Sequence, residues 1–280
     1  MNFEIDSKLI KNLFLKKTLM SQGNKEHEKI KPLLLILSGA MRGAVGAGVT
    51  MALSKLELHN VFDAVVGVST GAGNAAYLLG GFNQTCLGAA VYYEDLSKNF
   101  IRFTKSPIAD VDYVEWVISQ SPKQIDRSAI MQNRSEFYVA ATEFGSGRGV
   151  LLNAKKSALA MTRVIKASIA MLGLYGQSVC IDDKSYIDGA ISLPFPIKEA
   201  IEKFKPTDIL VIANTDKSKA THVDLSAMEL AFMKFLFRKS PEHLKQQAMV
   251  RHLKWIMSYN YFRSISLNKG IIWSGNDIHL

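Results

Sequence analysis

The pentapeptide 67–71, Gly-Val-Ser-Thr-Gly, has residue types and spacing that can do chemistry. It fits G-x-S-x-G, in which a serine on a sharp turn between a strand and a helix holds its hydroxyl exposed. The apolar residues 61–66 before it predict a buried strand, and the small residues 72–79 after it have helical spacing. Helix amides behind the serine favour negative charge at that spot. The pattern therefore predicts a nucleophile at Ser69.

A serine hydroxyl is a weak nucleophile until a base accepts its proton. None of the histidines follows a convincing apolar strand, so we expect each of them on a surface or a helix face: His27, His59, His222, His243, His252 and His279. Asp188 ends a short strand-like stretch and precedes Gly189. Such an Asp-Gly pair either frees a carboxylate on a tight turn or merely forms the turn. The residues alone leave both interpretations open, together with a Ser-His-Asp arrangement.

A glycine-bearing loop, residues 38–43, follows the apolar stretch 33–37 and leads into a predicted helix that ends near Leu56. Such a loop presents unpaired backbone N–H groups at the start of a helix. These groups suit either a nucleotide phosphate or the oxyanion of acyl transfer. No Gly-Lys-Ser/Thr follows the loop, the dinucleotide spacing fails, and the serine turn comes soon afterwards. The oxyanion hole is therefore the favoured interpretation.

The composition is that of a globular protein, with 48% hydrophobic and 21% charged residues over 280 positions. A disordered chain is excluded by these values, and the length suffices for one large α/β domain. The formal net charge of +9 favours anionic surfaces, either nucleic acid or acidic lipid headgroups. No nucleic-acid recognition motif or aromatic stacking patch is present, so we expect no nucleic-acid partner.

The two cysteines, Cys86 and Cys180, stand outside any metal-ligand spacing. We expect both to be reduced core residues, and we expect neither a metal nor another cofactor. No apolar run approaches the length of a membrane span. Residues 1–20 carry Glu4 and Asp6 and lack a small-residue cleavage site, which argues against a secretory signal. We therefore expect a cytoplasmic or peripheral membrane protein.

Predicted strands alternate with predicted helices along most of the chain. The strands are expected at 33–37, 61–66, 136–142, 149–153, 186–190, 208–214 and 271–273, and the helices at 72–80, 83–100, 110–119, 157–171, 196–204, 225–237 and 241–259. This alternation predicts an α/β fold of three layers, α/β/α, with a mostly parallel central sheet. Residues 1–20 predict an amphipathic lead helix and residues 21–31 a linker. We expect a division into this segment, 1–31, and a single domain, 32–280.

Three stretches together resemble the patatin-like phospholipase family, in its bacterial type. That family has a G-G-G-x-R-G loop after its first strand, a G-x-S-x-G elbow and, further on, D-G-G or D-G-A. This chain has Ser-Gly-Ala-Met-Arg-Gly at 38–43, the elbow at 67–71 and Asp-Gly-Ala at 188–190, in the same order and at comparable separations. The resemblance covers about residues 31–214 and implies a patatin-like fold.

The resemblance implies a Ser–Asp dyad without histidine. Ser69, between the elbow glycines Gly67 and Gly71, would be the nucleophile. Asp188 would be the general base, which takes the serine proton and later activates water.

The same resemblance assigns the loop to the oxyanion hole. Backbone N–H groups around Gly39, Ala40 and Met41 would hold the tetrahedral oxyanion, and Arg42 would lie near it or hold the shape of the loop before Gly43. Ser38 and Ala40 stand where the family usually has glycine. If the turn requires a positive φ at Ala40, we expect a strained backbone there or a distorted hole.

These observations predict a serine lipid acyl hydrolase of the phospholipase A or lysophospholipase type, an enzyme of lipid degradation. The expected substrate is a phospholipid or another acyl lipid. An acyltransferase on the same fold and a catalytically impaired lipid- or partner-binding protein are the alternatives. Residues 228–263 interleave basic and aromatic side chains, which fits contact with an anionic membrane or, equally, two helices packed on the sheet.

Overall fold

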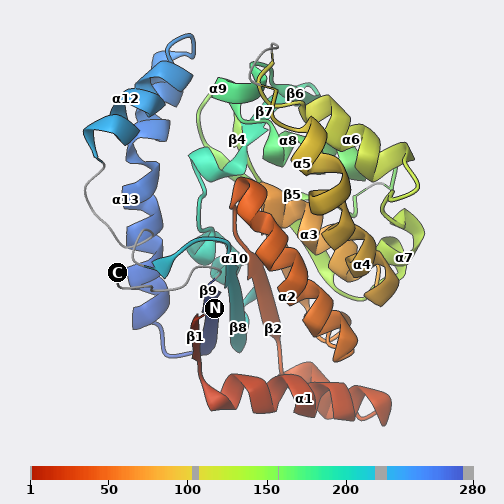
Figure 1. Ribbon diagram of the computed structural model, residues 1–280. Coiled ribbons are helices and arrows are strands. Elements are labelled where there is room, and N and C mark those ends of the chain that lie inside the picture. The colour runs from red at the N-terminus through yellow and green to blue at the C-terminus, as the bar shows by residue number, and fades with distance from the viewer. Residues whose placement is uncertain (1, 103–106, 157, 218–225, 274–280) are drawn as a thin grey trace.

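The computed structural model describes residues 2–102, 107–156, 158–217 and 226–273, and its core is one large sheet between helices (Figure 1). The strands are β1 (Asn2–Ile5), β2 (Pro32–Ile36), β3 (Ala64–Val68), β4 (Glu136–Glu143), β5 (Gly149–Asn153), β6 (Val179–Ile181), β7 (Lys184–Asp188), β8 (Asp208–Ala213) and β9 (Asn268–Trp273). In the described part of the chain they pair in the order β1-β9-β8-β2-β3-β4-β7-β6, and β5 pairs with β4.

The helices follow the strands in alternation. They are α1 (Ser7–Ser21), α2 (Gly43–Lys55), α3 (Thr70–Leu79), α4 (Phe82–Ala90), α5 (Ser97–Asn99), α6 (Val111–Gln120), α7 (Arg127–Gln132), α8 (Met161–Ile169), α9 (Leu172–Tyr175), α10 (Ile197–Phe204), α12 (Ala227–Leu236) and α13 (Glu242–Ser264). Short helical turns are η1 (Lys25–Lys29), η2 (Ala40–Arg42), η3 (Val91–Leu96, a π turn) and η4 (Gly189–Ile191). The helix predicted over 83–100 is thus interrupted by η3.

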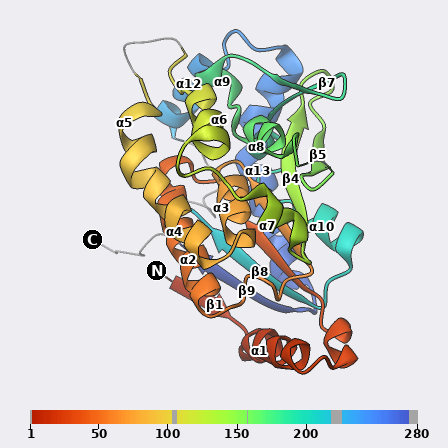
Figure 2. The ribbon, with the colours of Figure 1, turned by 90° about the vertical axis from the view of Figure 1, so that its right-hand side faces the viewer.

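The centre of the sheet is parallel. β2 pairs in parallel with β3 and β8, while β3 pairs with β4 and β8 with β9 in the same sense. β2, β3 and β8 are buried at every position, as expected for parallel strands covered on both faces. Antiparallel pairs occur at β1–β9 and around β4, β5, β6 and β7. The predicted three-layer α/β/α fold is confirmed (Figure 2).

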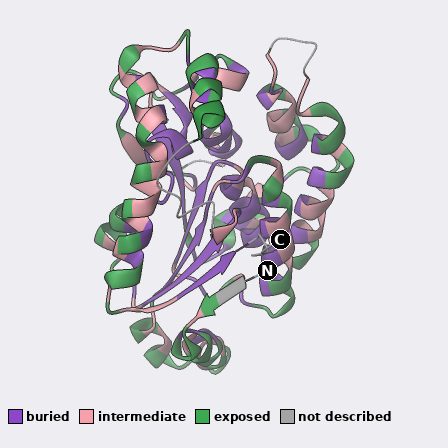
Figure 3. Cartoon of the chain, turned by 60° about the vertical axis from the view of Figure 1, so that its left-hand side comes forward, coloured by how far each residue is buried: buried purple, intermediate pink, exposed green. Residues whose placement is uncertain are grey.

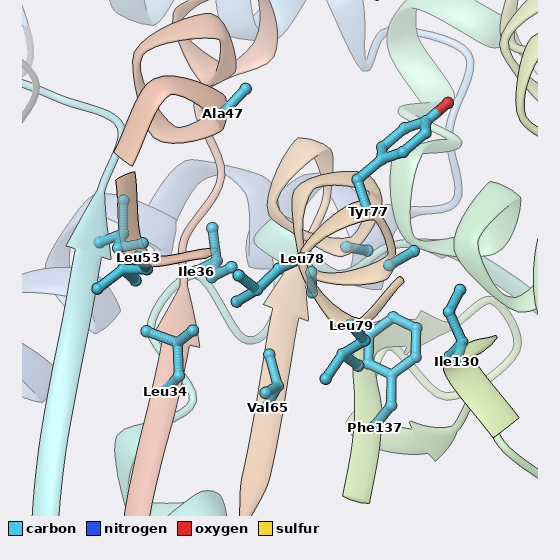
Figure 4. Close-up of a cluster of buried hydrophobic side chains, with 14 of the residues drawn as sticks. Leu34, Ile36, Ala47, Leu53, Val65, Tyr77, Leu78, Leu79, Ile130 and Phe137 are labelled. Carbon is cyan, nitrogen blue, oxygen red and sulfur yellow. The ribbon is translucent and has the colours of Figure 1, made fainter. Parts of the chain in front are cut away.

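Alternate residues along the strands pack into two hydrophobic cores, one on each face of the sheet, because successive side chains in a strand point to opposite faces. Leu34 and Ile36 of β2 face the cluster that includes α2 and α3, shown in Figure 4. Leu33 and Leu35 face the cluster that includes α10 and α13. The central strands are accordingly buried along most of their length, while the outer faces of the helices are exposed (Figure 3).

The first thirty residues differ from the sequence-based prediction. Residues 2–5 form β1, an edge strand paired with β9, and the helix begins only at Ser7. Four residues are too few for a strand period to stand out from a helical one. The expected linker contains η1. The division at residue 31 stays a prediction, although residues on both sides of it contribute to the same sheet.

The prediction of two core cysteines is wrong for Cys180. Cys180 is exposed and Cys86 is only partly buried, and both are free thiols. Cys180 lies on β6, the edge strand next to β7, where the period of two turns its side chain outward between Val179 and Ile181.

Helix α3 approaches the sheet closely at Gly71. A Cβ atom there would lie 2.0 Å from the carbonyl oxygen of Ile36 on β2, and that backbone has no room to yield. Gly73, one half-turn further along the same helix, has no atom within 4 Å of such a Cβ. Helix α3 therefore rests on β2 through a contact that only glycine permits.

We expect Gly71→Ala to lower the free energy of unfolding by about 3 kcal/mol or more, because the added methyl must displace backbone. The control Gly73→Ala should raise it by about 0.5–1 kcal/mol, since it removes glycine from a helix interior without a clash. Urea denaturation followed by circular dichroism measures both. Equal effects of the two substitutions would contradict the contact between α3 and β2.

Candidate active site

Ser69 lies on the turn between β3 and α3 with φ 53° and ψ −125°. Such a backbone conformation is costly for a residue with a Cβ, by about 1–3 kcal/mol, and persists only where its surroundings enforce it. The Ser69 N–H donates to Ser168 Oγ on α8 at 2.8 Å, and Ser168 Oγ donates to the Ala140 carbonyl at 2.6 Å. A Cβ at Gly67 would lie 2.4 Å from Ala72 Cα. The hydrogen bond to Ser168 and the close packing of Gly67 against Ala72 therefore both fix the turn. The role of Ser168 was not predicted from the sequence.

The structure brings Ser69 and Asp188 together. Ser69 Oγ donates to Asp188 Oδ2 at 2.9 Å. Asp188 is the last residue of β7, and its other oxygen, Oδ1, accepts the Ala190 N–H at 2.8 Å. Thr142 Oγ1 on β4 donates to the Asp188 carbonyl at 3.0 Å. Both carboxylate oxygens are thus engaged, and one of them faces the serine hydroxyl.

Asp188 is 1% exposed, so its carboxylate has lost almost all hydration. This desolvation raises the pKa of Asp188 to about 6, against the opposing effects of the hydrogen bonds from Ala190 and Ser69 and of the charge of Arg251. A carboxyl with a pKa near 6 is ionised at neutral pH and is a stronger base than an exposed aspartate. Perturbed groups of this kind cluster at functional sites.

The glycine loop turns sharply before α2. Gly39 has φ −172°, in extended backbone, whereas Ala40 has φ 48°, in the left-handed region that favours glycine. The strain expected at Ala40 is therefore present. Within the described residues, no hydrogen-bond acceptor is found for the N–H groups of Gly39, Ala40 and Met41. These three donors are available to an oxyanion.

Asn214, which directly follows β8, contacts the glycine loop at Leu37 and Gly39. Its Nδ2 donates to the Leu37 carbonyl at 2.7 Å, and a Cβ at Gly39 would lie 2.3 Å from Asn214 Cβ. Asn214 is fully buried, and a buried asparagine at a strand end is the signal that points to such a role. Sequence reasoning treated it only as the end of a strand.

A second support joins the loop to the elbow helix. Asn74 Nδ2 on α3 donates to the Gly43 carbonyl at 2.9 Å, and Tyr92 Oη donates to Asn74 Oδ1 at 3.1 Å. A Cβ at Gly43 would lie 2.4 Å from the Tyr92 hydroxyl oxygen. The loop and the serine turn are consequently parts of one hydrogen-bonded unit.

Ser69 opens on a cavity of about 270 Å³. Gly39, Ala40 and Arg42 of the loop line it, and the C-terminal helix α13 contributes Arg251 and others. A smaller apolar cavity of about 50 Å³ adjoins it at Ala40 and is lined by Met41 among others. Three of the predicted loop residues therefore meet Ser69 at one cavity, whereas Met41 lines only the smaller cavity and Gly43 lines neither. The contribution of α13 was not predicted from the sequence.

No histidine in the described ranges hydrogen-bonds to Ser69; the recorded acceptor of its hydroxyl is Asp188. His252 lines the cavity from α13. His222 and His279 lie outside the described residues. In the part of the chain that the structure describes, no three or more histidine, cysteine, aspartate or glutamate side chains are grouped to hold a metal ion. No helix of this part is long and apolar enough to cross a membrane.

A family model for patatin-like phospholipases matches residues 34–201. The chain belongs to the patatin-like phospholipase family. The matched segment contains the glycine loop, the serine elbow and Asp188, whereas α13 with its Arg251 lies beyond it.

Among curated proteins, the uncharacterized protein YjjU of Escherichia coli (strain K12) is 30% identical over 186 residues, which are 64% of this chain and 50% of YjjU. The chain thus spans about half the length of this relative. Among solved structures, VipD from Legionella pneumophila matches 73% of this chain and 54% of its own at 12% identity and a TM-score of 0.41. The structure of the ExoU–SpcU complex from Pseudomonas aeruginosa matches 81% of this chain and 52% of its own chain, at 13% identity and a TM-score of 0.37. The family assignment rests on the family model.

We expect Ala40→Gly to raise the free energy of unfolding by about 1 kcal/mol, because glycine adopts a positive φ without the Cβ penalty. The matched control is Ala52→Gly on the exposed face of α2, which should lower it by about 1 kcal/mol. Urea denaturation of the three proteins measures both changes. Destabilisation by Ala40→Gly as large as that by Ala52→Gly would contradict the strained loop.

Proposed function

We propose that this protein is a serine lipid acyl hydrolase of the phospholipase A or lysophospholipase type, with Ser69 as nucleophile and Asp188 as general base. The observation that carries the proposal is the hydrogen bond of 2.9 Å from Ser69 Oγ to the buried Asp188 carboxylate. This contact supports the proposal because a carboxylate that accepts the hydroxyl proton can activate the serine. The hydroxyl lies on a strained turn at the edge of a cavity.

In the proposed first step, Ser69 Oγ attacks the carbonyl carbon of an acyl ester while its proton passes to Asp188 Oδ2. The oxyanion that forms is held by the free N–H groups of the glycine loop. The tetrahedral intermediate then collapses, and the departing alcohol takes the proton from Asp188. In the second half, a water molecule gives a proton to Asp188 and attacks the acyl-serine, and the fatty acid leaves as Ser69 regains its proton.

The loop that departs from the family's glycines retains its donors, which favours an active enzyme over an impaired one. Ala40 adopts the positive φ that a glycine would adopt there. Gly39 and Gly43 keep the two positions where a Cβ would collide with Asn214 and Tyr92. The substitution therefore costs stability without closing the loop.

We expect the kcat/KM for a soluble acyl ester to rise with pH up to about pH 6 and to level off above it. Because burial raises the pKa of Asp188 to about 6, the carboxyl is protonated below that pH and cannot accept the serine proton. A pH–rate profile of ester hydrolysis measures this. Ser69→Ala should abolish turnover at every pH.

A histidine base would give a similar profile, so the matched variant is His252→Gln, which removes the described histidine that lines the cavity. The rise near pH 6 should persist in His252→Gln and disappear in Asp188→Asn. Loss of the rise in His252→Gln, or its retention in Asp188→Asn, would refute Asp188 as the base.

We also propose that α12 makes peripheral contact with an anionic membrane. Met228, Phe232 and Phe235 are more than half exposed on this helix, and the basic side chains around them, Lys234, Arg238 and Lys239, are exposed as well. Apolar side chains among cations suit the interface of acidic lipids.

The inner face of α12 supports this orientation. Met233 and Leu236 pack with Ile187 and Ile191, which flank the Asp188 turn. Figure 1 shows α12 at the end of the molecule towards which β2 runs. The serine elbow follows β3, which is parallel to β2 and therefore runs towards the same end. The remainder of the basic stretch, α13, packs Tyr259 and Phe262 into the core. In this proposal α12 contacts the membrane, whereas α13 packs against the sheet.

We expect the double variant Phe232→Ser/Phe235→Ser to bind phosphatidylglycerol-containing vesicles at least about tenfold more weakly than the wild type, because each buried Phe contributes about 1.5–3 kcal/mol. Co-sedimentation at two salt concentrations measures binding, and high salt should weaken it. Tyr93→Ser, which removes an aromatic residue 80% exposed on η3, is the control and should bind like the wild type. Equal binding by all three proteins would exclude α12 as the contact.

A further inference from the structure

Two arginine side chains from distant parts of the chain line the cavity at Ser69. Arg42 comes from η2 and Arg251 from α13. In the described part of the chain, neither guanidinium makes a hydrogen bond or an ion pair to another side chain. Burial lowers the pKa of the Arg251 guanidinium, and the nearby charge of Arg42 lowers it further, against the opposing charges of Asp188 and Glu229. Two guanidinium groups that line one cavity without a direct ion pair indicate a site for an anion.

The cavity contains other polar groups but little negative charge. The Nδ1 atom of His252 is buried and has no partner among the described residues, and Thr215 adds a hydroxyl at the end of β8. The carboxylates of Asp188 and Glu229 attract Arg251, but neither forms an ion pair with it. The oxygens of Asp188 already accept the Ser69 hydroxyl and the Ala190 amide. A bound anion would supply the direct hydrogen bonds that the half-buried Arg251 guanidinium lacks within the described residues.

We propose that Arg251, together with Arg42, forms a subsite that binds the phosphate of the substrate beside the ester that Ser69 attacks. The proposal rests on the proposed hydrolase function and deepens it, because it selects phosphate-bearing acyl lipids over neutral glycerides. Guanidinium groups bind phosphate through paired N–H donors, and two of them match an anion with several free oxygens. A cavity of about 270 Å³ that is shared with Ser69 has room for a phosphate and the glycerol unit between it and the ester.

Arg251 lies outside the segment that matches the family model, which ends at residue 201. The subsite is therefore a property of the C-terminal helix of this chain. Arg251 is a specificity residue in this proposal, and its removal should change the choice between substrates more than the chemistry at Ser69.

The test compares two substrates with the same acyl ester, dodecanoyl lysophosphatidic acid and monododecanoylglycerol, both below their aggregation concentrations and at a pH well above 6. The wild type should prefer the phosphate-bearing substrate in kcat/KM. Arg251→Gln should lower the ratio of the two values about tenfold to a hundredfold, the range for a charge-assisted contact. Arg251→Lys keeps the charge but loses the paired donors, so its ratio should lie between those of the wild type and Arg251→Gln.

The control is Arg263→Gln, which removes an exposed arginine from the far end of the same helix and should leave the ratio unchanged. Thermal denaturation shows whether each variant is folded. An equal loss on both substrates in folded Arg251→Gln, or a wild type without preference, would overturn the subsite.

Competition separates phosphate from the carboxylate of a fatty acid product. Dodecyl phosphate should inhibit the wild type more strongly than dodecanoate, and Arg251→Gln should reduce the difference. Equal inhibition by the two compounds, lost equally in Arg251→Gln, would assign the arginines to the carboxylate and overturn the proposal.

Failure of the hydrolase proposal would look different, since neither ester would then be turned over. Calorimetric binding of dodecyl phosphate to the wild type and to Arg251→Gln would still decide the subsite. Weaker binding by the variant supports it, and equal binding overturns it.

Discussion

The hydrogen bond between Ser69 and Asp188 depends on the register of three strands. Val68, the residue before the serine, pairs with Ala140 in the parallel ladder of β3 and β4. Asp188 pairs with Ala141, the next residue of β4, in the antiparallel ladder of β4 and β7. A slip of one residue in either ladder would turn one side chain to the other face of the sheet. The catalytic pair of the proposal is therefore fixed by backbone pairing through β4.

Ala140 is the point where these constraints meet. Its carbonyl accepts from Ser168, whose oxygen in turn accepts the Ser69 amide. A Cβ at Gly189 would lie 2.2 Å from the same carbonyl oxygen, so the turn after Asp188 can approach only as glycine. The strain at Ser69 and Ala40 and the desolvation of Asp188 are destabilising by themselves. The buried parallel strands around them hold these groups in place, as is common where function conflicts with local preference.

The sequence was sufficient for the parts that depend on short-range patterns. Neighbouring residue types reveal the apolar strands, the elbow glycines and the Asp-Gly turn, because each of these features has local requirements. No local pattern reveals the roles of Ser168, Asn214 and Arg251, because each of these residues interacts with a residue far away in the chain. A lone serine in an Ala-rich helix or an arginine in a basic helix has an ordinary explanation until the fold places it. The short strands β1 and β6 were missed for a related reason, since three or four residues do not establish a period.

The most direct test of the central claim is covalent labelling with a fluorophosphonate, followed by mass spectrometry of the labelled peptide. The account predicts that the folded wild type is modified at Ser69, that Ser69→Ala is not modified, and that Asp188→Asn reacts far more slowly because no base takes the serine proton. A folded wild type that stays unlabelled, a label on another residue, or an Asp188→Asn variant that reacts as fast as the wild type would contradict it.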